Sequence, residues 1–134
     1  YGSNMMPNDG RVINNFLHQC LNLKPLTIYG DGNQTRTFCH IDDLIEGLFL
    51  LMNSNYQNPI NFGGLEEIKI INLAKRIQAK MKSKTTLNFL KLPKDEPIKR
   101  KPDLKLAKQI LNWSPKINLN NGLDITIREL FSIN

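Results

Sequence analysis

Short runs of strand-forming residues alternate along this chain with amphipathic helical patterns, and this alternation limits its fold more than any other feature. Between residues 8 and 24, apolar side chains recur every three or four positions, the spacing of one helix face, with Asp9 as a candidate cap. Pro25 ends that pattern, and residues 26–29 then read as a strand that stops at four turn-forming residues. Because alternating helices and strands pack as mixed layers, the sequence predicts an α/β fold.

The rest of the chain continues the same alternation. A strongly apolar helix is expected after Asp42 or Asp43, and the breadth of its apolar surface predicts burial on more than one side. Prolines restrict residues 92–102 to a loop, and Asp103 is a candidate cap for the helix that follows. The other expected elements are strands over residues 35–41, 59–62 and 85–90 and helices over residues 44–52, 66–82, 103–113 and 119–131.

The chain has 134 residues, enough for one compact core. It contains no apolar run near the roughly 18 residues of a membrane span and no signal-peptide pattern. It opens at Tyr1 rather than at a methionine, which indicates a processed start or a fragment. Cys20 and Cys39 do not make a disulfide framework and are expected to be reduced thiols, so the sequence predicts a cytoplasmic protein.

The net charge of +6 is concentrated in one part of the sequence. Residues 69–108 carry thirteen basic and three acidic residues, a balance of +10. Such a block is one signature of nucleic-acid binding, but it holds a single aromatic residue, Phe89, and its lysines occupy the polar positions of amphipathic patterns. A solvated surface is therefore the favoured interpretation.

The segment from Tyr29 to Phe38 is the most informative, because a strand enters a turn with two glycines and is followed by Arg36. Backbone N–H groups of such a turn can approach an anion closely, and an arginine can bind phosphate oxygens with two N–H groups. The alternative is a hairpin turn with a surface arginine, which local evidence favours. Arg100, before a helix start, and Arg11 are further anion candidates, against a solvated loop and a surface ion pair.

Metal binding and nucleophilic catalysis find little support in the sequence. Histidine and cysteine are suitable zinc ligands. However, His18 and Cys20 lie two apart on a predicted helix, and Cys39 and His40 are adjacent on a predicted strand, so neither pair points to one side. The sequence also lacks a GxSxG nucleophile turn, a GxGxxG turn and a phosphate-binding P-loop. No metal site is therefore expected.

Taken in order, several short motifs resemble the C-terminal half of a UDP-glucuronate decarboxylase. That family belongs to the extended short-chain dehydrogenase/reductases, together with NAD-dependent nucleotide-sugar epimerases and dehydratases. The resemblance covers nearly the whole chain, and the order and spacing of the motifs are more specific than any one of them. The motifs are Tyr1-Gly2, Asn8-Asp9-Gly10-Arg11-Val12, Pro25 to Gly32, Gln34-Thr35-Arg36, Asp43 to Leu48, Asn61-Phe62-Gly63, Arg100-Lys101-Pro102-Asp103 and Trp113-Ser114-Pro115.

The resemblance implies a site for a UDP-sugar. Arg36 and Arg100 match positions that hold the substrate diphosphate between two guanidinium groups. Thr27 and Tyr29 match the strand that lines the uracil pocket. The other matched substrate positions are Arg11, Val12, Asn15, Gln34, Asn61 near the uridine, and Asp103, which would face the ribose or cap its helix. Tyr1 and Arg11 would also lie at the cofactor side.

The resemblance also implies a division of labour along the chain. Residues 41–62 would add a helix and a strand to the Rossmann-type parallel sheet of an NAD-binding domain, and residues 8–40 and 65–134 would build a smaller substrate domain. In this family, NAD takes a hydride from C4 of the sugar, the 4-keto acid loses CO2, and the hydride returns to give UDP-xylose.

The catalytic Tyr-x-x-x-Lys pair and the glycine-rich NAD loop of the family are absent from this sequence. The resemblance therefore implies the substrate-binding half of a UDP-glucuronate decarboxylase, inactive alone, with NAD held by an N-terminal half-enzyme. The alternatives are an epimerase or dehydratase fragment and a non-catalytic UDP-sugar-binding module. Exposed apolar faces would favour self-association, and neither nucleic acid nor a membrane is expected as a partner.

Overall fold

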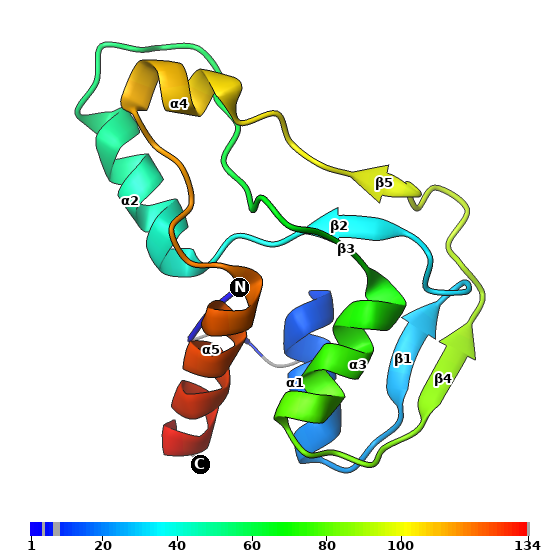
Figure 1. Cartoon of the computed structure of the whole chain (residues 1–134). Coiled ribbons are helices and arrows are strands. Elements are labelled where there is room, and N and C mark those ends of the chain that lie inside the picture. Colours follow the sequence, from blue (N-terminus) through cyan, green and yellow to red (C-terminus); the bar gives the residue numbers. More distant parts are fainter. Residues whose placement is uncertain (4, 7–8, 134) are drawn as a thin grey trace.

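Two parallel strands and two helices form the central unit of the computed structural model, which describes residues 1–3, 5–6 and 9–133. β1 (Leu26–Tyr29) pairs in parallel with β4 (Leu87–Leu90). α1 (Val12–Leu21) and α3 (Ile70–Lys80) pack against each other and against β1 (Figure 1). The α/β class predicted from the sequence is confirmed.

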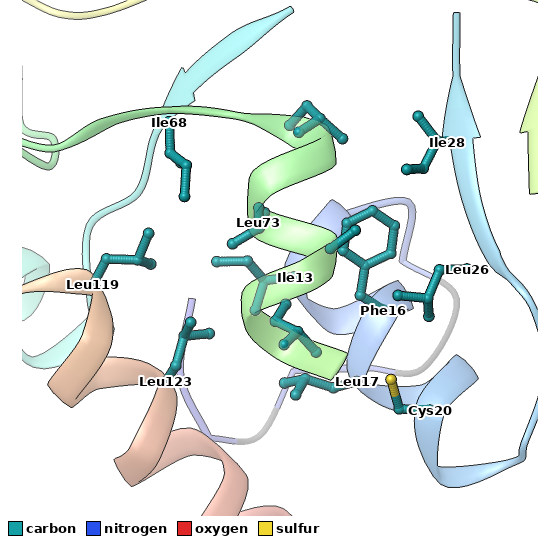
Figure 2. Close-up of a cluster of buried hydrophobic side chains, with 13 residues drawn as sticks. Ile13, Phe16, Leu17, Cys20, Leu26, Ile28, Ile68, Leu73, Leu119 and Leu123 are labelled. Carbon is teal, nitrogen blue, oxygen red and sulfur yellow. The ribbon is translucent and has the colours of Figure 1, made fainter. Parts of the chain in front are cut away.

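The hydrophobic core lies where these helices meet β1, and Figure 2 shows its side chains converging from several elements. Phe16 and Leu17 of α1 are each 1% exposed, and Leu73 of α3 is fully buried. Burial of a side chain of this size contributes about 1.5–3 kcal/mol to folding, so the cluster holds the central unit together. Its members are Ile13, Phe16, Leu17, Cys20, Leu26, Ile28, Ile68, Ile70, Leu73, Ala74, Ile77, Leu119 and Leu123.

A second, smaller sheet has three very short strands. β2 (Thr35–Thr37) is its middle strand, with β3 (Glu67–Lys69) antiparallel on one side and β5 (Lys99–Arg100) parallel on the other. The Thr35 hydroxyl donates to Glu67 Oε1 at 2.7 Å and so links two of the strands.

Three further helices surround the sheets. α2 (Ile41–Met52) and α4 (Lys105–Leu111) lie side by side, away from β1 and β4, whereas α5 (Leu119–Ile133) adds to the core (Figure 1). Trp113, after α4, donates from Nε1 to the carbonyl oxygen of Asp43 in α2 at 2.9 Å. The buried Asp43 carboxylate accepts from two backbone N–H groups in the segment before α5, at 3.1 and 2.9 Å. Among the described residues, no helix has the length and apolar character needed to cross a membrane.

The starts of the first two helices differ from expectation. α1 begins at Val12 rather than at residue 8, because Asp9 accepts from the Arg11 N–H at 2.9 Å and closes a bend outside the helix. Positions 7 and 8 lie outside the described residues. α2 is capped by the imidazole of His40, which accepts from the Asp42 N–H at 3.4 Å, so the expected aspartate cap is wrong.

Several strand predictions differ from the structure. The strand expected over residues 35–41 ends at Thr37, and residues 59–62 form no strand. A strand needs a neighbour for its backbone groups, and no described segment pairs with residues 59–62. Residues 67–69, expected to be helical, instead pair with β2, and β5 forms inside the predicted loop for the same reason.

The broad burial expected of α2 is also wrong. Its buried residues are Asp43 and Gly47. Its large apolar side chains are exposed, as Phe49 (65%) and Met52 (83%) illustrate. We call the side chains of Ile45, Leu48, Phe49 and Met52 the apolar face of α2. An exposed patch of this kind marks an interaction surface or an association hazard.

Candidate functional site

A cavity of about 730 Å³ opens between α1, β1, β2 and the loop that precedes β5. Cavities of this volume suit a small-molecule ligand. Of the residues predicted to form a site, only Asn61 and Asp103 are absent from its lining. The predicted residues that line it are Tyr1, Arg11, Val12, Asn15, Thr27, Tyr29, Gln34, Arg36 and Arg100.

One wall of the cavity is the edge of β1 that faces away from β4. The N–H groups of Leu26 and Gly30 donate to β4 and its flank, so the backbone groups of the intervening Thr27 and Tyr29 point to the opposite edge. Gln19 of α1 covers one end of this edge, because its Oε1 accepts from the Thr27 N–H at 3.1 Å. At the other end, Gln34 Nε2 donates to the Tyr29 carbonyl at 2.8 Å.

Two backbone groups of this edge remain available to a ligand. The Thr27 carbonyl and the Tyr29 N–H have no hydrogen-bond partner among the described residues. They present one acceptor beside one donor, on the edge of a strand that lines the cavity. A flat group with an N–H next to a carbonyl is complementary to this pair.

The second sheet brings two arginines to the same cavity. β2 and β5 run in parallel with Arg36 opposite Arg100 in the register, so both side chains leave the same face. Both residues line the cavity. Neighbouring guanidinium groups repel each other unless an anion lies beside them, and their fork geometry matches phosphate oxygens. The pair therefore suits an anion that reaches both groups.

The two arginines differ in their partners. Arg36 Nη1 donates to the Thr35 carbonyl at 2.7 Å, and its Nη2 forms an ion pair with the Glu96 carboxylate. The Arg36 side chain is only 11% exposed, and that of Glu96 is 37% exposed. Arg100 is exposed and has no ion-pair partner in the described part of the chain. The unpartnered positive charge of the pair therefore lies on Arg100.

α1 lines the cavity with the side of the helix that carries Val12, Asn15 and Gln19. Asn15 Oδ1 is buried without a hydrogen-bond partner among the described residues, and an acceptor of this kind is costly unless a ligand or water reaches it. Arg11, just before the helix, lies 3.6 Å from Asp9 as a surface ion pair with a 72% exposed side chain. The ion pair named as its alternative role is therefore present, although Arg11 also lines the cavity.

Asn61 and Asp103 are brought together, but away from the cavity lining. Asn61 Nδ2 donates to the Asp103 carbonyl at 3.5 Å. Asp103 Oδ1 accepts from the Lys105 N–H at 2.9 Å, so its carboxylate stabilises the start of α4 from just outside the helix. The N-cap residue of α4 is Leu104, so the cap predicted at Asp103 lies one residue too early, although the Asp103 carboxylate does contact the start of the helix.

The glycine turn after β1 is neither of the two things that the sequence suggested. A hairpin would pair β1 with β2, but the strands belong to different sheets. Gly30 and Gly32 are absent from the cavity lining, so the turn does not hold an anion there. The turn is instead closed internally by Asp31, whose Oδ1 accepts from the Asn33 N–H at 2.9 Å.

Tyr1 lies at one end of the cavity with its hydroxyl directed away from it. Its ring is edge-on to Phe38 and His40, with centroid distances of 6.5 and 5.3 Å. Its hydroxyl is buried against Gly122 of α5 and has no hydrogen-bond partner among the described residues. Burial therefore raises the pKa of the Tyr1 phenol.

The four candidate metal ligands form no metal centre. No group of three or more His, Cys, Asp or Glu side chains in the described part of the chain is placed to hold a metal ion. Cys20 and Cys39 are free thiols, as predicted. This cavity also does not fit NAD, because its described residues include no glycine-rich turn leading into a helix that would hold the pyrophosphate.

The sequence interpretation missed three polar residues of the cavity, Gln19, Thr37 and Glu96. Gln19 was detectable, because it lies four and seven positions after Asn15 and Val12 on one helix face. Glu96 was not detectable, because it lies in a predicted loop and its ion-pair partner, Arg36, is sixty positions away in the sequence.

This chain is similar to known proteins over most of its length. The sequence model of the NAD dependent epimerase/dehydratase family matches residues 1–63. UDP-glucuronic acid decarboxylase 1 of Danio rerio is 44% identical over 96% of this chain, and UDP-glucuronic acid decarboxylase 2 of Arabidopsis thaliana is 42% identical over 96%. This chain spans only 31% and 29% of those relatives. The resemblance stated from the sequence is confirmed.

Solved structures give the same result for the fold. A UDP-glucuronic acid 4-epimerase from Bacillus cereus, in complex with UDP-glucuronic acid and NAD, is 31% identical with a TM-score of 0.89. The match covers all of this chain and 43% of the epimerase. An epimerase from Methanothermobacter thermautotrophicus has a TM-score of 0.93 at 25% identity, covering 98% of this chain and 40% of its own. The fold is thus that of a portion of an extended short-chain dehydrogenase/reductase, and NAD dependence is a property of this group.

Proposed function

We propose that this chain is the nucleotide-sugar-binding part of an NAD-dependent UDP-glucuronate decarboxylase. The observation that carries the proposal is the register of β2 and β5, which places Arg36 beside Arg100 at one cavity. That arrangement matches a diphosphate, because each phosphate can be bound by one planar guanidinium group. The identity of 42–44% to the decarboxylases over nearly the whole chain favours the same substrate.

The uracil of UDP-glucuronate would bind the open edge of β1. Its imide N–H would donate to the Thr27 carbonyl, and a neighbouring ring carbonyl would accept from the Tyr29 N–H. Gln19 and Gln34 support this role by holding the two ends of the edge. Asn15, with its unpartnered buried Oδ1, would contact the nucleotide from α1 together with Val12 and Arg11.

We propose that the chain contributes to two domains of the enzyme. Residues 8–40 and 65–134 would form the substrate domain, and residues 41–62 would join the sheet of an NAD-binding domain. The exposed apolar face of α2 supports this, since such a face suits burial against a sheet. The unpaired state of residues 59–62 supports it too, because a strand forms there only beside a neighbour.

The proposed role of this chain in the reaction is to bind and orient the substrate. NAD would supply the redox chemistry when held by an N-terminal half-enzyme. Because the sequence has no Tyr-x-x-x-Lys pair, we expect the 134-residue chain to form no UDP-xylose from UDP-glucuronate with added NAD. Product formation by the purified chain would contradict this.

Titration calorimetry with UDP tests the binding site. We expect measurable binding to the wild-type chain and at least a tenfold loss in both Arg36→Ala and Arg100→Ala, since each removes a charge-assisted contact worth roughly 1.5–3 kcal/mol. Lys99→Ala is the matched control: Lys99 neighbours Arg100 but pairs with Glu67, at 3.3 Å, and is absent from the cavity lining. Unchanged affinity in both arginine variants would overturn the site.

A UDP-glucuronate epimerase is the second candidate, supported by the Bacillus cereus structure at 31% identity. Both enzymes would bind the same substrate, so the calorimetry above does not separate them. The product separates them. After reconstitution with an N-terminal half, a decarboxylase would release CO2 from UDP-glucuronate, whereas an epimerase would leave the carboxylate of the sugar in place. A nucleic-acid-binding role is disfavoured. A binding constant for nucleic acid that does not fall as the salt concentration rises would argue against it.

A further inference from the structure

The cavity contains one acidic side chain at a place where an anion is proposed to bind. Glu96 lines the cavity and forms an ion pair with Arg36, one of the two arginines of the pair. The other Nη of Arg36 already donates to the Thr35 carbonyl. A phosphate that approached the Nη2 side of Arg36 would therefore meet a carboxylate of the protein itself.

The backbone around Glu96 presents its carboxylate from a stiff turn. The Glu96 N–H donates to the Pro93 carbonyl at 3.2 Å. Pro97 follows directly and restricts the backbone of Glu96 to extended conformations. Because Pro93 also lines the cavity, this turn forms part of the wall. The carboxylate is thus placed beside Arg36 by the fold of the loop, and its partly exposed side chain leaves it room to move away.

We propose that Glu96 is an internal competitor for the anion position beside Arg36, and that it thereby lowers the affinity for ligands that place a phosphate there. This inference rests on the proposed UDP-sugar site. A phosphate at Arg36 and the Glu96 carboxylate repel each other at short range, so the carboxylate must leave when the phosphate binds. The exchange of one anion for another at Arg36 therefore gains less than binding to an unpaired arginine would.

Arg100 decides which ligands overcome this exchange. It has no ion-pair partner in the described part of the chain, so an anion that also reaches Arg100 gains a contact without displacing anything. A diphosphate spans both arginines, whereas a nucleoside lacks any group that needs Arg36. Glu96 therefore weakens every ligand that places an anion at Arg36, and a ligand that also reaches Arg100 offsets part of this cost with a second contact.

Titration calorimetry of the 134-residue chain with UDP and with uridine tests this role. In Glu96→Gln we expect the affinity for UDP to rise roughly threefold to fivefold, the upper part of the range for an exposed ion pair, while the affinity for uridine stays within twofold of wild type. Glu96→Asp, with a carboxylate one methylene shorter, is expected to give a smaller gain. Asp95→Asn is the matched control: it removes the same charge from the same loop, but Asp95 is exposed and absent from the cavity lining.

Three outcomes would overturn the inference. Unchanged or weaker UDP binding in Glu96→Gln would mean that Glu96 holds Arg36 for the ligand. An equal gain in Asp95→Asn would mean that overall charge is responsible. Absence of UDP binding in wild type and in Glu96→Gln alike would overturn the proposed function, and the competitor role with it. Failure of the competitor role alone is distinguishable, because wild-type UDP binding then remains.

Discussion

Cys39 shows how burial controls the chemistry of a single side chain beside the cavity wall. Burial, helped by the negative charge of Asp43, raises the pKa of its thiol from 9.0 to about 11. The thiol remains protonated and donates weakly to the His40 carbonyl at 3.5 Å. A thiol in this state is a structural group, because the thiolate is the reactive form.

We expect iodoacetamide to modify Cys39 about a hundredfold more slowly in the folded chain than in the urea-unfolded chain at pH 8, because the folded thiolate is that much rarer. Mass spectrometry of the peptide would measure both rates. The unfolded thiol loses its proton first, so stability should fall as pH rises from 9 towards 11. Cys39→Ser should reduce this slope; equal labelling rates in the two states would contradict the shift.

Among the elements, the turn between β1 and β2 depends on a glycine with no room for a side chain. Gly32 has φ +75°, and a Cβ there would lie 2.9 Å from Ile28 Cγ2 and from Ile71 Cβ. Both contacts involve branched side chains of the packed interior. The turn therefore requires glycine for two independent reasons, its backbone conformation and the close approach of its neighbours.

We expect Gly32→Ala to lower the free energy of unfolding by about 2–4 kcal/mol, because left-handed strain and overpacking add. Gly10→Ala is the control: Gly10 has φ +82°, but a Cβ there would meet no atom within 4 Å. It should cost about 1–2 kcal/mol from strain alone. Urea denaturation would compare the two variants, and an equal loss in both would show that packing around Gly32 is unimportant.

The elements that the sequence predicted well are those set by local periodicity. The buried face of α1 and the limits of β1 follow from apolar spacing and from Pro25, so both could be read directly. β3 and β5 have three and two residues and exist only because each pairs with β2. Their residues carry no periodic signal, which is why the sequence suggested a helix and a loop.

The candidate site divides in the same way. Its residues could be predicted from a resemblance, since the short motifs keep their order along the chain. The contacts between them could not, because Arg36 meets Glu96 and Arg100 through pairing between distant segments. For Asp103, the motif pointed to the ribose or to a cap, whereas Leu104 is the N-cap residue and Asp103 contacts the Lys105 N–H from just before it.

For the whole molecule, the apolar face of α2 is a surface exposed to water in the described part of the chain. The chain covers 40–43% of the two solved structures described above, so most of their length has no counterpart in this sequence. A helix face with Phe49 and Met52 exposed to water favours contact with any complementary apolar surface. Two copies of the isolated chain can therefore bury this face by associating with each other.

We expect the purified chain to self-associate in a concentration-dependent manner, measured by analytical ultracentrifugation. The double variant Phe49→Glu/Met52→Glu should shift it towards monomer, because charge on the apolar face of α2 opposes its burial. Phe89→Glu is the control, since Phe89 is also 51% exposed but lies on β4. A monodisperse wild-type monomer, or equal effects of both changes, would contradict the assignment to α2.

The two glutamines on the edge of β1 have a consequence for the solubility of the protein. An open strand edge is a template to which another chain can add a strand, and proteins that leave one exposed risk aggregation. Gln19 and Gln34 occupy the outer backbone groups of this edge, and the stretch between them is too short to pair with a strand. The Thr27 carbonyl and the Tyr29 N–H can thus bind a small molecule, while the edge of β1 does not pair with a strand of another polypeptide.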